Sequence, residues 1–122
     1  MQVDVARVSA ALAASLIAVD GVVDESEKEV AIRMGHRMLP GFSNLVFETL
    51  LDGLDELPSA FELATTLTEV LDSETKDTII NYLVAIATAD NEIVEVELQE
   101  LEAVAQALGV PLPPIKVSAK DA

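Results

Sequence analysis

The amino-acid sequence predicts an all-α protein, a bundle of about six helices in a single domain. Apolar residues make up 51% of the 122 residues, with only three Phe and one Tyr, so the expected core is aliphatic. An Ala- and Leu-rich sequence favours helices over sheets. Apolar positions recur at helical spacing, and one helix–turn–helix pattern occurs twice along the chain. A chain of this length fits one domain.

The first unit is predicted to be a helix, a turn and a second helix. Apolar side chains recur every three or four residues over Val5–Val19, with Ala at most positions between them, so this helix should be central. Asp20-Gly21 ends it, because Gly permits a left-handed backbone and Asp favours turns. The next helix begins after Asp24, an N-cap candidate with Glu27 as its capping-box partner. It should stop near Leu39, because Pro-Gly follows.

Two further helices are predicted after the first unit. One covers about Asn44 to Leu54, with Ser43 as its N-cap. The other covers about Ser59 to Leu71, with Pro58 at or beside its first position. No Gly/Ser-rich linker divides the chain, so residues 1–109 are expected to form one helical domain. Residues 110–122 contain three prolines and a polar end, and we expect them to be irregular or disordered.

The second unit repeats the first at an offset of seventy residues. Ser73 is its cap candidate, and an apolar helix leads to the turn Asp90-Asn91, where Asn replaces Gly as a residue that tolerates positive φ. The last helix runs to about Leu108, with Gly109 as a C-cap candidate. Val94 stands at the position of Asp24 and has no side-chain oxygen for capping. The matched pairs are Asp20 with Asp90, Val23 with Ile93, Glu25 with Glu95, and Glu27 with Glu97.

The apolar positions of the second helices keep the same offset. Ala31, Met34 and Met38 match Leu101, Val104 and Leu108. An internal duplication is the simplest account of this register. Met34 and Met38 are expected to fill gaps in the core rather than to form a groove for a partner.

Both turns resemble the signature of a known family. Residues 18–27 read AVDGVVDESE and resemble the Ala-x-Asp-Gly-x-Val-x-x-x-Glu signature of TerB-like domains, which are named for a bacterial tellurite-resistance protein. Residues 87–97 read ATADNEIVEVE and repeat the signature with Asn in place of Gly. The resemblance covers about Val8 to Gly109. It implies a twofold pseudo-symmetric all-α bundle, a link to stress or tellurite resistance, and acidic turns that bind divalent cations.

Carried over by position, the resemblance implies five cation ligands: Asp20, Asp24, Glu27, Asp90 and Glu97. Hard cations such as Ca²⁺ or Mg²⁺ need several converging oxygen ligands, which an Asp in a turn and a Glu one helical turn later can supply. A second interpretation stays open. Asp20 and Asp90 can bond the amides of their own turns, and Glu27 can complete a capping box. Because Val94 is not acidic, the second set is less complete.

Composition excludes several other partners. The formal charge of −15, from 22 acidic and 7 basic residues, argues against binding nucleic acid through a basic face and against anionic membranes. The absence of cysteine excludes disulfides and thiolate chemistry. The apolar stretch Val8–Val19 is too short to span a bilayer, and Asp4 stands where a signal peptide needs basic residues. We therefore expect a cytoplasmic protein.

Catalytic and known metal motifs do not fit the sequence. An EF-hand fails because the third position from Asp20 is Val22. A di-iron bundle needs two Glu-x-x-His motifs, and His36 is the only histidine. Neither a Ser–His–Asp pattern nor a phosphate-binding loop occurs. We expect a non-catalytic binding or scaffold domain with a protein partner or self-association. The alternatives are a purely structural interaction domain without metal and, more remotely, a metal-dependent hydrolase.

Overall fold

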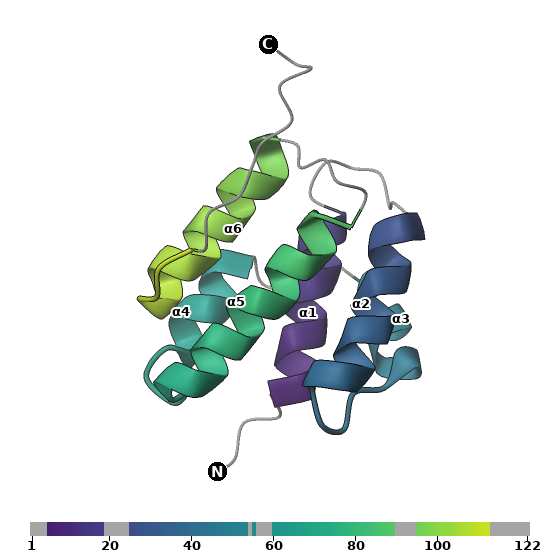
Figure 1. The fold of residues 1–122 in the computed structure, drawn as a ribbon, viewed down its shortest axis with the longest axis horizontal. Coiled ribbons are helices and arrows are strands. Elements are labelled where there is room, and N and C mark those ends of the chain that lie inside the picture. The colour runs from purple at the N-terminus through teal and green to yellow at the C-terminus, as the bar shows by residue number, and fades with distance from the viewer. Residues whose placement is uncertain (1–4, 19–24, 54, 56–59, 90–94, 113–122) are drawn as a thin grey trace.

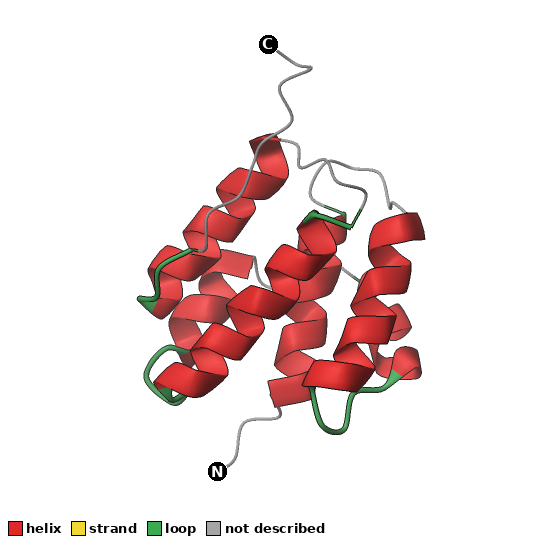
Figure 2. Ribbon diagram, viewed as in Figure 1, coloured by secondary structure: helices red, strands yellow, loops and turns green. Residues whose placement is uncertain are grey.

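Six helices form a bundle in the computed structural model, which describes residues 5–18, 25–53, 55, 60–89 and 95–112 (Figure 1). Within these ranges there is no strand (Figure 2), and the predicted all-α class is confirmed. The helices are α1 Val5–Ile17, α2 Glu25–Met38, α3 Asn44–Asp52, α4 Ala60–Leu67, α5 Ser73–Ala87 and α6 Glu95–Leu108.

The repeat seen in the sequence is also present in the structure. Helices α2 and α6 each have 14 residues, and their first and last residues are seventy positions apart. Helices α1 and α5 end seventy positions apart as well. Ala31 and its counterpart Leu101 are both fully buried. The same unit therefore folds in the same way twice, with α1 and α5 as its first helices and α2 and α6 as its second.

Helix α1 is the centre of the bundle, as its apolar sequence predicts. It packs against each of the other five described helices. Ala10, Ala13 and Ala14 are at most 1% exposed, and their small side chains let neighbouring helices approach on several sides. Helix α5 is less enclosed, because its main neighbours are α1, α2 and α6. It keeps a narrow polar strip with Asp77 and Asn81 exposed.

Capping residues set the helix ends. Ser43 caps α3 as predicted, and its hydroxyl accepts a hydrogen bond from the Val46 amide at 3.3 Å. Asp72, and not Ser73, caps α5 by accepting a hydrogen bond from the Thr75 amide at 2.8 Å. Both residue types cap well, so the sequence does not distinguish these neighbours. At the end of α6, Gly109 has a φ of 74°, as expected for a C-cap.

Helix α4 is shorter than predicted. It ends at Leu67, four residues before the expected Leu71. The chain here contains Thr65, Thr66 and Thr68, whose β-branched side chains have low helix propensity. Thr68 also uses its hydroxyl outside the helix, donating a hydrogen bond to the Leu108 carbonyl at 3.2 Å. Helix α3 likewise ends at Asp52, two residues before the predicted Leu54.

Two of the three Phe residues, the Tyr and the His gather around Phe42, at the junction of α2, α3 and α5, whereas Phe61 is exposed on α4. The Phe42 ring lies 5.2 Å from His36, 6.0 Å from Phe47 and 6.4 Å from Tyr82, measured between ring centroids. The Tyr82 hydroxyl donates a hydrogen bond to the Ala31 carbonyl at 2.7 Å, which joins α5 to α2 inside the core. Burial raises the pKa of Tyr82 well above its ordinary value.

Candidate functional site

The helix ends that flank the two acidic turns lie at one end of the bundle. The C-terminal ends of α1 and α5 and the N-terminal ends of α2 and α6 are all at the top of Figure 1. Of the five predicted ligands, Asp20, Asp24 and Asp90 lie outside the described residues. Glu27 and Glu97 are described, and the geometry of the candidate site rests on them.

Glu27 and Glu97 are buried carboxylates at equivalent positions. Each is the third residue of its helix, in α2 and α6, and each is only 4% exposed. Carboxylates are seldom buried to this extent unless they are hydrogen-bonded, ion-paired or bound to a metal. Both interact with other parts of the chain. The N-terminal turn of a helix also favours negative charge. The two carboxylates that the sequence repeat matches therefore have the same burial and the same place in their helices.

A complete cation-binding cluster is not assembled from the described residues alone. Within the described ranges, no group of three or more Asp, Glu or His side chains is arranged to hold a metal ion. The ligand sets implied by the sequence each include at least one residue outside those ranges. Cation binding at the two turns therefore stays a prediction.

One polar contact near this end was not predicted from the sequence. The Ser15 hydroxyl donates a hydrogen bond to Glu100 Oε2 at 2.9 Å. This bond joins the last turn of α1 to α6, one helical turn beyond Glu97. At the seventy-residue offset the counterparts are Ala85 and Val30, both apolar. The contact joins the first unit to the second and has no equivalent at the matching pair of positions, and no local pattern marks it because the partners are 85 residues apart.

His36 lies at the surface, at the junction between α2 and the start of α3. Its Nε2 shares a hydrogen bond with Asn44 Oδ1, and its ring meets the edge of Phe42. These contacts connect α2 to the start of α3. They give His36 a structural role between two helices.

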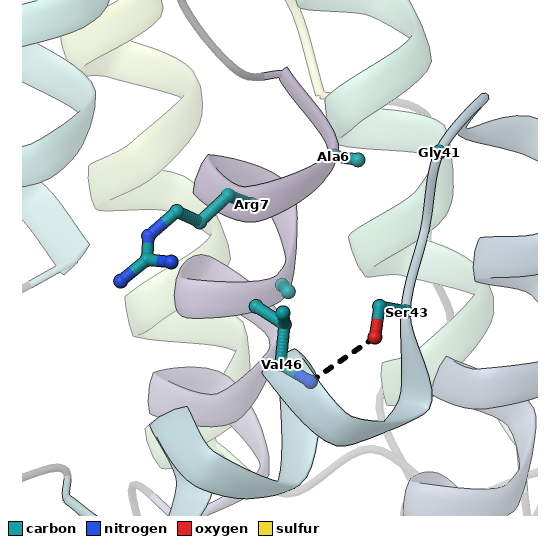
Figure 3. A pocket seen from close by; sticks show the side chains of 6 residues that line it. Ala6, Arg7, Gly41, Ser43 and Val46 are labelled. Atoms are coloured by element: carbon teal, nitrogen blue, oxygen red, sulfur yellow. Dashed lines mark hydrogen bonds between the residues drawn. The ribbon is translucent and has the colours of Figure 1, made fainter.

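Cavities of different size lie away from the helix ends that flank the acidic turns. One of about 40 Å³ is shown in Figure 3 and is lined by residues from α1, from α3 and from the chain before α3. Its only hydroxyl, on Ser43, is the one that caps α3. A space of this size admits water but no organic ligand. The six lining residues are Ala6, Arg7, Ala10, Gly41, Ser43 and Val46.

A larger cavity measures about 440 Å³ and lies where the C-terminal end of α2 meets the first turns of α1 and α5. It is at the opposite end of the bundle from the start of α2 and α6. Its lining holds one carboxylate, two hydroxyls and otherwise apolar side chains, which is not a catalytic set. The lining residues are Val5, Ala6, Met38, Leu39, Pro40, Glu74, Thr75 and Thr78.

Comparison with known proteins gives the family. None of the described helices has both the length and the apolar character needed to cross a membrane. No curated protein and no solved structure matches the chain. The model of the family described as Tellurite resistance protein TerB matches residues 6–114, nearly the whole chain and all but the first residue of the six helices. With its two signature turns and its duplicated helix pairs, this chain belongs to the TerB family.

Proposed function

We propose that this chain is a non-catalytic binding and scaffold domain of the cytoplasm, which holds a divalent cation, Ca²⁺ or Mg²⁺, at its acidic turns and contacts a protein partner. The equal burial of Glu27 and Glu97 carries this proposal. Membership of the TerB family supports the type of domain. From the name of the family, the proposal extends to a role of this domain in the response to tellurite or another stress.

The two halves of the repeat differ in the residue at the N-cap position of the sequence but not in carboxylate burial. A reciprocal capping box needs an oxygen at the N-cap as well as the carboxylate at the third helical position. The first unit has Asp24 before α2, whereas the second has Val94 before α6. If reciprocal capping alone placed the carboxylates, Glu97 should be the more exposed of the two. Both are 4% exposed, which favours a role that the two turns share.

Oxygen ligation of a hard cation is such a role. Asp20, Asp24 and Glu27 in the first unit, and Asp90 and Glu97 in the second, are all oxygen donors of the kind Ca²⁺ and Mg²⁺ prefer. The net charge of −15 raises the local concentration of cations and makes neighbouring carboxylates repel one another. A bound cation would offset that repulsion. With its extra carboxylate, the first unit should bind more tightly than the second.

The purely structural alternative also has support. Glu27 and Glu97 already interact with other parts of the chain, as expected if they only stabilise the helix starts. This alternative predicts that Asp20→Asn with Asp90→Asn lowers the melting temperature equally with and without chelator. Cation binding predicts a larger effect when the cation is present, because ligation stabilises the folded state.

A titration followed by NMR tests the cation. Ca²⁺, Mg²⁺ or Mn²⁺ is added to the full chain while the amide signals of residues 20–27 and 90–97 are observed. Glu27→Gln, which keeps the shape of the side chain, should abolish the response of residues 20–27 and leave that of residues 90–97. The control is Glu102→Gln, an exposed carboxylate on α6, which should change neither. Silence at both turns up to millimolar cation rejects the cation half of the proposal.

A further inference from the structure

One half of the repeat has a helix, α4, with no counterpart among the described residues of the other half. Helix α4 packs against α6 and α1. Because the repeat relates α6 to α2 and α1 to α5, the equivalent place lies against α2 and α5. Among the described helices only α1, the counterpart of α5, packs against both α2 and α5. The place equivalent to that of α4 is therefore not taken by any other described helix.

The side chains that face this place are less buried on α2 than their counterparts on α6. In α6, Val104 and Leu108 are 1% and 2% exposed, and Thr68, directly after α4, bonds the Leu108 carbonyl. Their counterparts in α2, Met34 and Met38, are only partly buried. Since the two helices have the same length and register, the difference comes from what packs on them. Methionine is flexible and adapts to an incoming apolar surface.

The larger cavity adjoins the same place. Met38 forms one wall, and Thr75 and Thr78 of α5 form another. Its volume of about 440 Å³ is within the usual range of sites that enclose a ligand or an anchoring side chain. A helix as short as α4, with eight residues, is roughly 12 Å long and would run over about two turns of α2.

Basic residues edge the partly buried methionines. Lys28 pairs with Glu48, and His36 bonds Asn44, so these two side chains face α3. At 100° per residue, Arg37 lies on the opposite flank beside Met34 and Met38, with Arg33 at its outer edge. The counterparts of Arg33 and Arg37 in α6 are Ala103 and Ala107. The second unit, which has α4, therefore lacks these charges.

Compensation of the helix dipole does not explain Arg33, which lies before the last turn of α2. Helix α2 has basic residues in its last turn, whereas the other five described helices have none. Arg33 has one long ion pair, 3.9 Å from Glu29, between side chains that are 60% and 78% exposed. Such a pair contributes little to stability. In a chain with 22 acidic and 7 basic residues, an apolar strip edged by arginines fits a partner that brings its own carboxylates.

We propose that the α2–α5 groove, defined as the cavity walls at Met38, Thr75 and Thr78 together with Met34 one helical turn before Met38, is a docking site for a short amphipathic helix of a partner protein, with carboxylates along its polar edge. The partner helix would pack on α2 as α4 packs on α6. This deepens the proposed scaffold role by giving the chemistry of its partner, and it does not depend on cation binding. The two are tested at opposite ends of the bundle, so the failure of one is distinguishable from the failure of the other.

A peptide of residues 60–72, with blocked ends, serves as the probe. It contains α4, carries Glu62, Glu69 and Asp72, and has no basic residue. A hydrocarbon staple between positions 61 and 65, which are both exposed in the intact protein, keeps it helical. Added to the isotope-labelled full chain, it should shift the amide signals of Met34, Met38 and Thr78. A stapled peptide of the same composition in scrambled order should not.

Variants of the full chain separate the contribution of the arginines to peptide binding from that of Met38. Arg33→Ala with Arg37→Ala should weaken binding about tenfold, since two charge contacts at the rim are lost. Met38→Gln should weaken it as well, and both variants should keep their fold because the changed side chains are not fully buried. Lys28→Ala is the matched control: it removes a basic residue on the flank of α2 that faces α3, and it should leave binding unchanged.

Four results would overturn the proposal. The first is no shift from the stapled peptide up to millimolar concentration. The second is a response centred on Val104 and Leu108, which would mean that the peptide displaces α4. The third is an equal response to the scrambled peptide. The fourth is a dimer in sedimentation whose formation is lost in Met38→Gln, which would make a second copy of this chain the occupant of the groove.

Discussion

Replacing Gly35 by Ala should destabilise this protein, although the same change in most helices stabilises them. Ala is favoured over Gly inside a helix by about 1 kcal/mol. Here a Cβ on Gly35 would lie 2.6 Å from two atoms of the Phe42 ring and 2.8 Å from a third. The ring is 7% exposed and is held among His36, Phe47 and Tyr82, so it has little room to move. Overpacking of this kind costs about 1–3 kcal/mol, so we expect a net loss of about 1 kcal/mol.

The repeat supplies the control for this prediction. The counterparts of Gly35 and Phe42 are Ala105 and Leu112, so the second unit has the larger helix residue opposite the smaller partner. Gly35→Ala should lower the melting temperature by about 4 °C in calorimetry. The double variant Gly35→Ala with Phe42→Leu should lose less stability than the two single variants lose together. The double-mutant cycle should therefore give a favourable coupling free energy. A higher melting temperature for Gly35→Ala, or additive effects, would show that the ring does not limit this position.

Three further changes test individual interactions by urea or thermal unfolding. Tyr82→Phe should lower the free energy of unfolding by about 1 kcal/mol through loss of the bond to Ala31. Because burial raises the pKa of Tyr82 in the folded state, wild-type stability should fall as pH rises above the unfolded value of about 10, and the Phe variant should lack this fall. Asp72→Ala should lower the melting temperature at neutral pH, whereas Asp72→Ser should largely preserve it. Because the hydrogen bonds from Thr75 lower the pKa of Asp72, the difference in melting temperature between wild type and Asp72→Ala should shrink as pH falls below 3.8. Ser9→Ala should raise the free energy of unfolding by roughly 0.5–1 kcal/mol, because the Ser9 hydroxyl is buried without a hydrogen-bond partner among the described residues. A loss of stability in this variant would mean that the hydroxyl has a hydrogen-bond partner.

Local chemistry explains why much of the fold was predictable. The starts and ends of α2 and α6 follow from turn residues and the seventy-residue register, and both helices occur where the repeat predicts them. Predictions failed where neighbours compete locally, as at Asp72 and Ser73, or where a long-range contact ends a helix, as Thr68 does after α4. Only the second kind of outcome depends on residues that are distant in the sequence.

For the candidate site, the sequence predicted which residues correspond but not how deeply they are buried. The repeat matched Glu27 with Glu97, but periodicity alone does not show how deeply a carboxylate at the start of a helix is buried. The bond from Ser15 to Glu100 has no sequence signal at all. Met34 and Met38 pack against the core as expected, but they are only partly buried, because none of the described helices packs on them as α4 packs on α6.

The sequence by itself determined that this chain forms two copies of one helix pair, because apolar spacing, turn residues and caps are local and are written twice. Only the tertiary structure decided that the copies are unequal. Helix α4 packs against α6 and α1, whereas α2 packs directly against α5. Which surface a helix covers depends on the competing burial of distant side chains, and a periodic pattern states that a face is apolar without stating what packs on it.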